Sequence, residues 1–377
     1  MHRTATRTPL AGLLAERIRQ RGAISFAEYM RECLYHPEHG YYSRPEAKRF
    51  ADFYTSVDVH PIFGRLLARQ FGEMWALAGK PQPFWVVEAG AGTGRLARHV
   101  LDFAARELSG FYGALRYVAV ESSAARRAAH AALLAAHGEG GRASSAAELP
   151  EQIPVGCVFS NELLDALPVH RVVNEQRTLR EMYVALDGEE FCEQLGPPST
   201  LALVEYFRAQ GIELREGQQA EAGLAACEWI EDAGRRLHRG FVLTVDYGHE
   251  ARELYNECHM RGTLLAYHQH RAGEDFYRAP GEQDLTAHVN FTALDLWGRR
   301  AGLERAGLVS LAQFLLALGR GNEFADLYEE GQSEVERLRA RLLLKNLIHP
   351  EGMGETFQVF IQYKGVETPL FTGLGSL

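Results

Sequence analysis

The sequence of 377 residues contains few cysteines, and their spacing matches no metal-binding pattern. The five cysteines are Cys33, Cys157, Cys192, Cys227 and Cys258, an odd number in which no two residues form a Cys-x-x-Cys pair. A disulfide framework or a zinc ribbon is therefore not expected. Free thiols favour a reducing compartment, and the N-terminus shows no apolar signal-peptide core. These two observations predict a cytoplasmic protein.

Long apolar runs and an excess of basic charge are also missing. No stretch approaches 18 uninterrupted apolar residues, so no membrane-spanning helix is expected. Lys and Arg total 40 against 49 for Asp and Glu, a net charge of −9, which argues against a nucleic-acid partner bound by a general basic field. Hydrophobic residues make up 46% and charged residues 24%, so most of the chain is expected to fold as a soluble globular protein.

The order of apolar patterns predicts an α/β fold. Short apolar runs alternate with helical patterns from residue 84 onwards, which predicts a doubly wound parallel sheet. The expected strands are 84–89, 117–121, 155–160 and 241–247, and the expected helices between them are 94–107 and 122–137. Before this core, residues 1–80 are predicted to form an N-terminal helical cap with helices at 10–21, 25–34 and 61–78.

Two further segments complete the predicted organisation. Residues 169–240 are expected to be an insertion that begins with an antiparallel meander, because Asp187-Gly188 is a strong hairpin signal. The chain beyond 241 should return to the core, with a long loop-rich stretch to about 290, a helix at 292–301, a strand at 304–311, charged helices at 323–347 and a final strand at 356–363. The predicted domains are thus 1–80, 81–168, 169–240 and 241–377.

The segment Glu88-Ala89-Gly90-Ala91-Gly92-Thr93-Gly94 lies between the first predicted strand and its helix. Glycines allow a sharp turn and a close approach of ligand to backbone, and the helix start offers free N–H groups. The dinucleotide fingerprint would need glycine at 95, where Arg95 stands. An acid before the turn is typical of class I S-adenosyl-L-methionine (SAM) methyltransferases, and it suits a ligand that carries an ammonium and a sulfonium.

Glu121 closes the second predicted strand and is followed by Ser122. A carboxylate there can accept hydrogen bonds from both ribose hydroxyls of a nucleoside. This acid fits NAD as well as SAM, so by itself it indicates a nucleoside ligand without choosing one. A purely structural turn with two strand-end acids is the alternative.

Asn161-Glu162-x-x-Asp165 follows the third predicted strand, whose carboxyl end should lie beside the reactive carbon of the cofactor. Closely spaced carboxylates suit a cationic or proton-losing methyl acceptor. The segment is not the Asn-Pro-Pro-Tyr/Phe motif used on amino groups of nucleobases. The alternative is that Asp165 caps a helix and Glu162 forms a structural ion pair.

These motifs together resemble the MidA-like family of class I SAM-dependent methyltransferases. The resemblance extends over nearly the whole chain and rests most specifically on the Asn161 segment and on Asp284-Leu285-Thr286-Ala287-His288. It also includes Gly40-Tyr41-Tyr42, Thr55-Ser56 and Asp246-Tyr247-Gly248. The chain departs from the family at Val57-Asp58, where Pro-Glu is common. Mitochondrial members are similar to protein arginine methyltransferases that assist assembly of respiratory complex I, whereas the arginine- and alanine-rich composition of this chain looks bacterial.

The resemblance and the motifs together predict a Rossmann-like methyltransferase core with an N-terminal helical cap and an inserted substrate region. SAM is the expected cofactor, S-adenosyl-L-homocysteine the product, and an arginine side chain of a partner protein the expected acceptor. A small-molecule O- or N-methyltransferase and a non-catalytic SAM-binding assembly factor are the alternatives. The expected catalytic residues are Asn161, Glu162, Asp165 and His288. The expected cofactor-binding residues are Glu88, Gly90, Ala91, Gly92, Gly94, Glu121, Ser122, Asn161, Thr55 and Ser56.

Other polar groupings carry less chemistry. His268-x-His270 with Asp275 lacks a fixed third ligand, so no metal site is expected. No serine stands in a nucleophile-elbow context, which argues against a serine hydrolase. The glycine-marked turns at 40–42 and 55–56 and the loop at 262–290 are expected to converge over the carboxyl edge of the sheet and to exclude water from the site.

Overall fold

The computed structural model describes residues 8–43, 61–268, 271–322, 324–325, 333–349 and 354–375. Contacts group the chain into two compact units. We call Tyr54–Leu163, Ile230–Tyr247 and Gly298–Leu377 the sheet unit, and Met1–Phe53, Leu164–Trp229 and Gly248–Trp297 the insertion unit. The domain boundaries expected from the sequence stay a prediction, because a grouping by contacts follows packing and not chain order.

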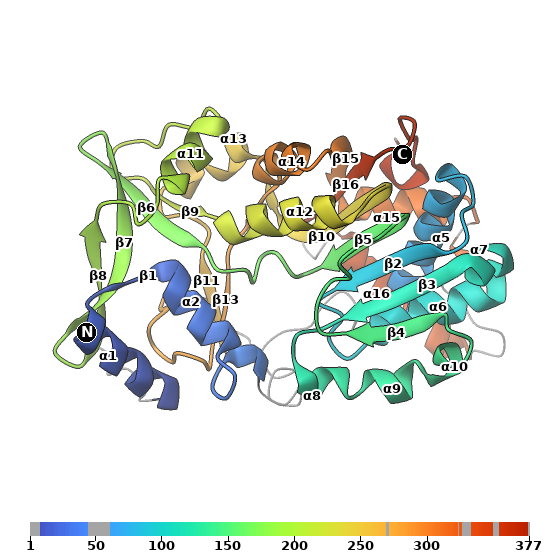
Figure 1. The fold of residues 1–377 in the computed structure, drawn as a ribbon, viewed down its shortest axis with the longest axis horizontal. Coiled ribbons are helices and arrows are strands. Elements are labelled where there is room, and N and C mark those ends of the chain that lie inside the picture. The colour runs from blue at the N-terminus through green and yellow to red at the C-terminus, as the bar shows by residue number, and fades with distance from the viewer. Residues whose placement is uncertain are drawn as a thin grey trace. The chain divides into compact units, whose positions relative to one another are not determined.

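The sheet unit is built on the mixed sheet in Figure 1, with strands in the order β15-β16-β10-β5-β2-β3-β4. The bounds are β2 (Phe84–Ala89), β3 (Leu115–Val120), β4 (Ala143–Ala146), β5 (Gly156–Asn161), β10 (Gly240–His249), β15 (Glu304–Ser310) and β16 (Phe357–Lys364). Strands β4, β3, β2, β5 and β10 are parallel, and β16 pairs antiparallel with β10 and with β15. The chain leaves β2 towards β3 and returns as β5 on the other side, which places the switch point between β2 and β5.

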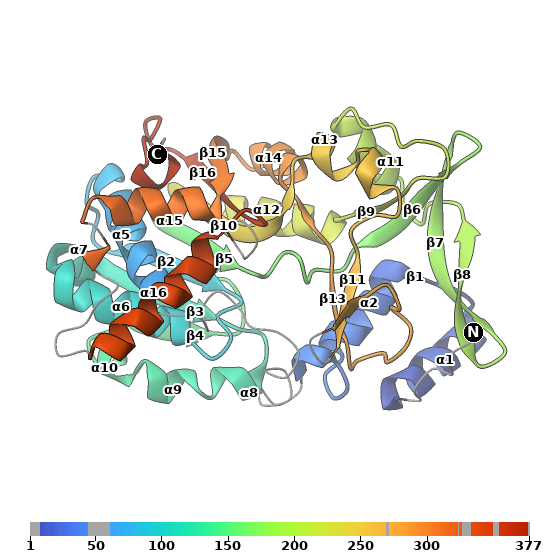
Figure 2. The same ribbon diagram turned by 180° about the vertical axis from the view of Figure 1, so that it is seen from behind.

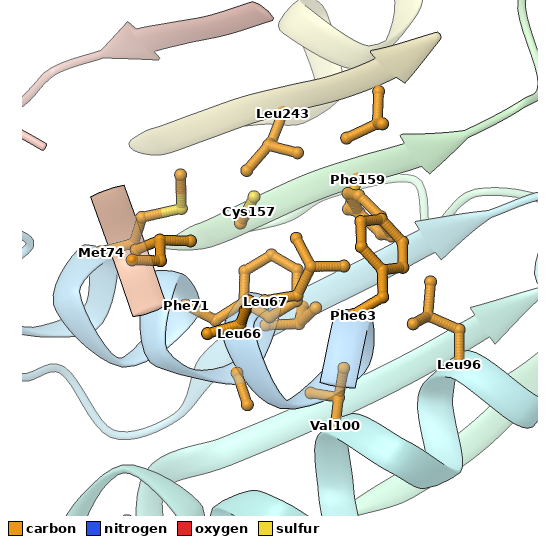
Figure 3. Close-up of a cluster of buried hydrophobic side chains, with 14 of the residues drawn as sticks. Phe63, Leu66, Leu67, Phe71, Met74, Leu96, Val100, Cys157, Phe159 and Leu243 are labelled. Atoms are coloured by element: carbon orange, nitrogen blue, oxygen red, sulfur yellow. The ribbon is translucent and has the colours of Figure 1, made fainter. Parts of the chain in front are cut away.

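The core of the sheet unit shows why β5 is held firmly (Figure 3). Helix α5 (Ile62–Leu77) presents apolar residues at helical spacing, among them Phe63, Leu67 and Phe71, and all three are fully buried. The Phe71 ring packs edge-on against that of Phe159 on β5, with centroids 5.5 Å apart. Burial of each such side chain stabilises the fold by roughly 1.5–3 kcal/mol. The strand whose end carries Asn161 is therefore anchored by α5.

The remaining helices of the sheet-unit segments are α6 (Arg95–Glu107), α7 (Ser109–Ala114), α8 (Ala124–Arg127), α9 (His130–Leu133), α10 (Ala135–Gly138), α15 (Leu311–Arg320) and α16 (Glu334–Ile348). Helices α12 (Leu224–Arg236) and α14 (Phe291–Arg300) run across a boundary between the units. No helix in the described part of the chain is both long and apolar enough to cross a membrane.

The insertion unit contains an antiparallel sheet in the order β1-β7-β6-β9, with β8 paired to β7. Its strands are β1 (Ile24–Ser25), β6 (His170–Glu175), β7 (Thr178–Asp187), β8 (Glu190–Gly196) and β9 (Gln219–Ala222). The pairing of Asp187 with Glu190 confirms the predicted hairpin turn. The helices are α1 (Pro9–Arg21), α2 (Phe26–Tyr35), α11 (Ala202–Ala209) and α13 (Ala251–Leu254), with short 3₁₀ turns η1 (Tyr41–Ser43) and η2 (Glu257–His259).

Two sequence predictions of local structure were wrong, and one helix was missed. The stretch to residue 290 is more ordered than expected, because it contains β11 (Leu265–His268), β12 (Arg271–Gly273), β13 (Asp284–Thr286) and β14 (Val289–Asn290). Strands of two to four residues are too short to show a readable alternation. The alanine-rich stretch 122–137 forms α8, α9 and α10 in place of one helix, and α15 was not predicted. The predicted fold class is nevertheless confirmed.

The N-terminal helices contact the loop that precedes β13 within the insertion unit, which Figure 2 shows from behind. The Thr8 hydroxyl donates to the Pro280 carbonyl at 2.8 Å, and the Tyr29 hydroxyl donates to the Phe276 carbonyl at 2.9 Å. A Cβ added at Gly281, whose φ is +77°, would lie 2.2 Å from the His39 carbonyl oxygen, so only glycine fits. The N-terminal helices and the long loop therefore pack against each other within the insertion unit. Thr55 and Ser56 lie outside the described residues, and the roof over the sheet edge stays a prediction.

Candidate active site

The glycine turn after β2 has the geometry of a ligand cradle. Gly90, Gly92 and Gly94 have φ angles of +76°, +56° and +86°. The Ala91 N–H donates to the Val120 carbonyl at 2.9 Å and ties the turn to β3. A Cβ added at Gly92 would meet nothing within 4 Å, whereas at Gly94 it would lie 3.0 Å from the His130 ring. The turn is thus tight on the protein side and open beside Gly92, where a ligand can approach the backbone.

Glu88 lies at the end of β2 and is buried, at 3% exposure. Its carboxyl accepts a hydrogen bond from the Tyr117 hydroxyl at 2.8 Å. Burial and, to a smaller extent, the nearby Glu121 carboxylate raise the pKa of Glu88 and the Tyr117 bond lowers it, with a net value of about 8. Glu88 is therefore mostly protonated at neutral pH unless a cation comes close.

Glu121 is held at the other side of the same turn. Its carboxylate accepts hydrogen bonds from the Gly92 N–H at 3.0 Å and the Ser123 N–H at 2.8 Å. Arg126 lies 3.7 Å away. Oε1 accepts the Ser123 N–H and the Ser122 hydroxyl, whereas Oε2 accepts the Gly92 N–H and keeps a second lone pair, so Glu121 can still accept a hydrogen bond from a ribose hydroxyl. Ser122 is exposed, and its hydroxyl lies 3.5 Å from Glu121 Oε1.

His130 braces the glycine turn, and sequence reasoning missed it. Its ring is buried and bonds through Nε2 to the Gly92 carbonyl at 2.9 Å and through Nδ1 to the Ser145 hydroxyl at 2.8 Å. The Ser145 hydroxyl can donate to Nδ1, which leaves the Nε2 proton for Gly92. Nothing in the local sequence around His130 indicates that it bonds to the glycine turn.

The turn after β5 brings Asn161 and Glu162 to the switch point of the sheet. Glu162 has a φ of +51°, a left-handed conformation that is uncommon for a residue with a side chain. The Glu162 N–H donates to the Val245 carbonyl at 2.9 Å, and Asn161 Nδ2 donates to Glu162 Oε1 at 3.1 Å. A Cβ at Gly90 would lie 3.1 Å from Leu163 Cδ1, so this turn and the glycine turn are neighbours.

Asp246, in the carboxyl-terminal half of β10, holds this turn in place through hydrogen bonds. Its side chain is fully buried and accepts hydrogen bonds from the Leu163 N–H at 3.2 Å and the Tyr247 N–H at 3.0 Å. The sequence marked Asp246 through the family resemblance and gave it no role. The structure shows that it positions the Asn161–Leu163 backbone.

Asp165 and His288, the other two predicted catalytic residues, belong to the insertion unit. Asp165 is buried, no helix begins there, and its carbonyl accepts the Ala287 N–H at 3.0 Å. The alternative that Asp165 only caps a helix is therefore wrong. His288 packs near the rings of His249 and His259, with centroids 5.3 and 6.5 Å away. Burial, followed by these two histidines, lowers the pKa of His288 to about 4. The catalytic role of both residues stays a prediction.

The grouping of His268, His270 and Asp275, where no metal site was expected, lies only partly within the described residues. Among the described residues, no set of three or more His, Cys, Asp or Glu side chains could hold a metal ion. His268 Nδ1 bonds to the Glu282 carbonyl at 3.0 Å, and His270 lies outside the described residues.

Comparison with known proteins agrees with this geometry. Residues 66–309 match the model of a family described as S-adenosyl-L-methionine-dependent methyltransferases. The chain is 30% identical to the mitochondrial protein arginine methyltransferase NDUFAF7 of Danio rerio, over 92% of this chain and 85% of that protein. It is 28% identical to the Homo sapiens NDUFAF7, over 94% and 83% of the two chains.

A solved structure is similar over almost its full length. The Burkholderia thailandensis protein crystallised with S-adenosyl-homocysteine superimposes with a TM-score of 0.86 at 32% identity, covering 98% of this chain and 97% of that chain. A second crystal structure of a protein from the same organism gives a TM-score of 0.84, also at 32% identity.

Proposed function

The chain belongs to the family of S-adenosyl-L-methionine-dependent methyltransferases, and we propose that its methyl acceptor is an arginine side chain of a partner protein. The predictions of a SAM-dependent methyltransferase and of SAM as the cofactor are confirmed. The arginine acceptor is supported by one observation above all. The NDUFAF7 proteins, named as protein arginine methyltransferases, match more than nine-tenths of this chain, including both units.

The described residues fit the cofactor. The open space beside Gly92 lets the ligand approach the backbone, and Glu121 can accept a hydrogen bond from the ribose. SAM supplies a methyl group on a sulfonium, and its transfer leaves a neutral thioether. The Gly90–Gly94 turn and Glu121 would therefore bind and orient the cofactor. Asn161 and Glu162 lie in the neighbouring turn after β5.

Glu162 has the charge that a cationic acceptor needs. A guanidinium that approaches a sulfonium meets repulsion, and a carboxylate about 4 Å away returns roughly 4 kcal/mol at an effective dielectric near 20, before desolvation. Asn161 Nδ2 holds one oxygen of this carboxylate at 3.1 Å. In the proposed step a guanidino nitrogen forms the bond to the methyl carbon, the C–S electron pair goes to sulfur, and the nitrogen loses a proton to a carboxylate or to water. Positioning and electrostatics would account for most of the rate.

The experiment is to incubate cell lysate with the full-length protein and SAM carrying an isotope-labelled methyl group, then to analyse proteins and metabolites by mass spectrometry. Label on arginine in a protein supports the proposal. Label on a small molecule favours the first alternative, and absence of transfer despite SAM binding favours an assembly factor. Gly92→Val is the matched control, since a variant that does not bind SAM transfers no methyl group, and label found with it comes from another enzyme in the lysate.

A cytoplasmic location is proposed separately. It is supported by the five cysteines, which are all free thiols. Fractionation of the native host with an antibody against the chain tests it, and enrichment in an oxidising compartment would contradict it.

A further inference from the structure

A cluster of tyrosines and aspartates lies in the insertion unit. It consists of Tyr35, Tyr42, Asp165, Tyr267 and Asp284, and we call it the tyrosine–aspartate cluster. The two carboxylates are more than nine-tenths buried, whereas the three tyrosines are partly exposed. The aromatic rings are thus accessible and the acids lie deeper.

Hydrogen bonds and ring stacking connect the members of this cluster. The Tyr42 hydroxyl donates to both carboxylate oxygens of Asp284, at 3.0 and 3.2 Å. The Tyr35 ring stacks on the Tyr42 ring with centroids 5.5 Å apart and planes at 28°. The Tyr35 hydroxyl donates at 3.0 Å to the carbonyl of Ala166, the neighbour of Asp165 in the chain. Residues from α2, η1, β13 and the segment after β5 therefore meet here.

Tyr267 closes the group from β11. It stands opposite Asp284 in the antiparallel pair of β11 and β13, where side chains on one face lie about 5 Å apart. Burial raises the pKa of Tyr267, and the charges of Asp165 and Asp284 raise it further. Both carboxylates are therefore close enough to the Tyr267 phenol to influence it electrostatically.

Thr286 adds an independent sign of a ligand. Its side chain is 4% exposed, and Oγ1 has no hydrogen-bond partner among the described residues. Thr286 lies two positions after Asp284 on β13, so both side chains point to the same face of the strand. A buried hydroxyl without a partner is costly, which makes it a group that a bound donor would satisfy.

The chemistry of the cluster matches a guanidinium. Two buried carboxylates repel each other, and a cation between them removes this cost. A guanidinium is planar, stacks on aromatic rings and carries five N–H donors in a fixed fork, enough for two carboxylates and one hydroxyl. An ammonium offers a point charge without a flat face, so it would use the tyrosine rings less well.

We propose that the tyrosine–aspartate cluster binds the guanidinium of the methyl acceptor, with Asp165 and Asp284 as charge partners, Tyr35, Tyr42 and Tyr267 as aromatic walls and Thr286 as an additional acceptor. This inference rests on the proposed arginine acceptor and assigns recognition of that side chain to the insertion unit.

The test uses the full-length protein saturated with S-adenosyl-homocysteine and titrated with N-acetyl-arginine methylamide at millimolar concentrations, followed by NMR. We expect the arginine compound to bind at least several-fold more tightly than the lysine analogue. Asp284→Asn should weaken arginine binding about 10-fold or more, because a charge-assisted hydrogen bond is lost while the side-chain shape is kept. Tyr42→Leu should also weaken it, since the stacked ring is removed.

Controls separate recognition from folding and from cofactor binding. Glu274→Gln removes one negative charge from an exposed site of the same unit, where Glu274 pairs with Arg261, and should leave arginine binding unchanged. S-adenosyl-homocysteine affinity and thermal unfolding should be nearly unchanged in all variants. If Asp284→Asn does not fold, Tyr42→Phe gives the second test, because it keeps the ring and removes only the bond to Asp284.

Failure of this inference can be distinguished from failure of the proposed function. If the wild type labels arginine in lysate but Asp284→Asn and Tyr42→Leu do so at the same rate, the cluster is not the acceptor site and the function stands. Absence of binding by the arginine compound, or equal binding of the lysine analogue, also overturns the inference. If the compound binds to the cluster but no arginine is ever labelled, the proposed function fails and the guanidinium site stands.

Discussion

Each unit buries a glutamate, and the surroundings of the two carboxyl groups differ. In the sheet unit, the groups that shift the pKa of Glu88 besides burial are the Tyr117 phenol and the Glu121 carboxylate, and neither is basic. In the insertion unit, Glu221 accepts the Thr263 N–H at 2.8 Å and the Thr263 hydroxyl at 3.2 Å. Burial raises the pKa of Glu221 too, but the Thr263 bonds and the charge of Arg171 act against the rise.

The two carboxyl groups differ in what stabilises their ionised forms. Glu221 receives its donors and its positive charge from its own unit, so its ionised form is supported whether or not a ligand is present. Glu88 lacks a basic neighbour among the groups that shift its pKa, and an incoming cation would favour its ionised form. SAM brings an ammonium and a sulfonium. We therefore expect the electrostatics of the sheet unit to depend on the cofactor, and those around Glu221 to be independent of it.

The largest expected effect comes from filling the space beside Gly92, which should keep the cofactor away from Glu88. Gly92→Val should abolish SAM binding while the protein still folds, because the added side chain enters open space that the ligand needs. Gly79→Val is a matched control, since Gly79 also has a positive φ, of +83°, and a Cβ there meets nothing within 4 Å. Calorimetry should show lost affinity only for Gly92→Val, with similar losses of thermal stability in both. Unchanged SAM affinity in Gly92→Val would contradict the cofactor assignment.

The pH dependence of stability sharpens the comparison next. The pKa of Glu88 is about 8 in the folded protein against 4.5 for an exposed glutamate, so the folded state binds more protons between these values. The stabilisation by Glu88 is therefore complete below about pH 4.5 and is lost as pH rises through about 8. The difference in pKa, at about 1.4 kcal/mol per pH unit, sets an upper bound of about 5 kcal/mol.

Glu88→Gln should remove this dependence in the cofactor-free protein. Urea unfolding should be measured between pH 5 and pH 9, which is about one pH unit above the Glu88 pKa. Over this range the free energy of unfolding should fall less in Glu88→Gln than in the wild type. Glu148→Gln, at an exposed position of the same unit, should keep the wild-type slope. If Glu88→Gln and wild type respond to pH alike, Glu88 is ionised in the empty protein and the contrast with Glu221 disappears.

The transfer step gives a third, smaller effect. Glu162→Gln should leave SAM affinity nearly intact and lower turnover by about 100-fold, a loss of roughly 2.7 kcal/mol of transition-state stabilisation. Glu162→Asp keeps the charge and a side chain that tolerates the left-handed backbone, so it should recover part of the rate. A fall in SAM affinity with full turnover would instead place Glu162 among the cofactor ligands.

The two units also differ in how far the sequence predicted them. In the sheet unit, strand, glycine turn and helix follow one another within residues 84–107, so the local pattern predicted the structure of this stretch. The cofactor-binding roles of its residues stay a prediction. In the insertion unit, Tyr42 and Asp284 are 242 positions apart and meet only through packing. The resemblance pointed to both residues, but no local pattern pairs them.

His130 shows the same limit inside the well-predicted unit. It lies 38 positions after Gly92, in a stretch that was expected to be one helix and is three short ones. The breaks around α9 set the direction of the imidazole, and an alanine-rich sequence without an apolar stripe does not reveal them. Contacts of this kind depend on the exact course of the backbone, which periodicity does not specify.

The smallest predicted effect tests this brace. His130→Ala should weaken SAM affinity about 10-fold, close to 1.4 kcal/mol, because the Gly92 carbonyl loses its buried partner and the turn loosens. His137→Ala is the matched control, since His137 is also buried but bonds through its two ring nitrogens to Tyr112 and Asp102 and not to the turn. Both variants should lose thermal stability, and only His130→Ala should lose affinity by calorimetry. His130→Gln, which keeps a donor, should recover part of it. Equal SAM affinity in the two alanine variants would mean that the turn keeps its shape without the imidazole, and that the cradle depends on its glycines and on Glu121 alone.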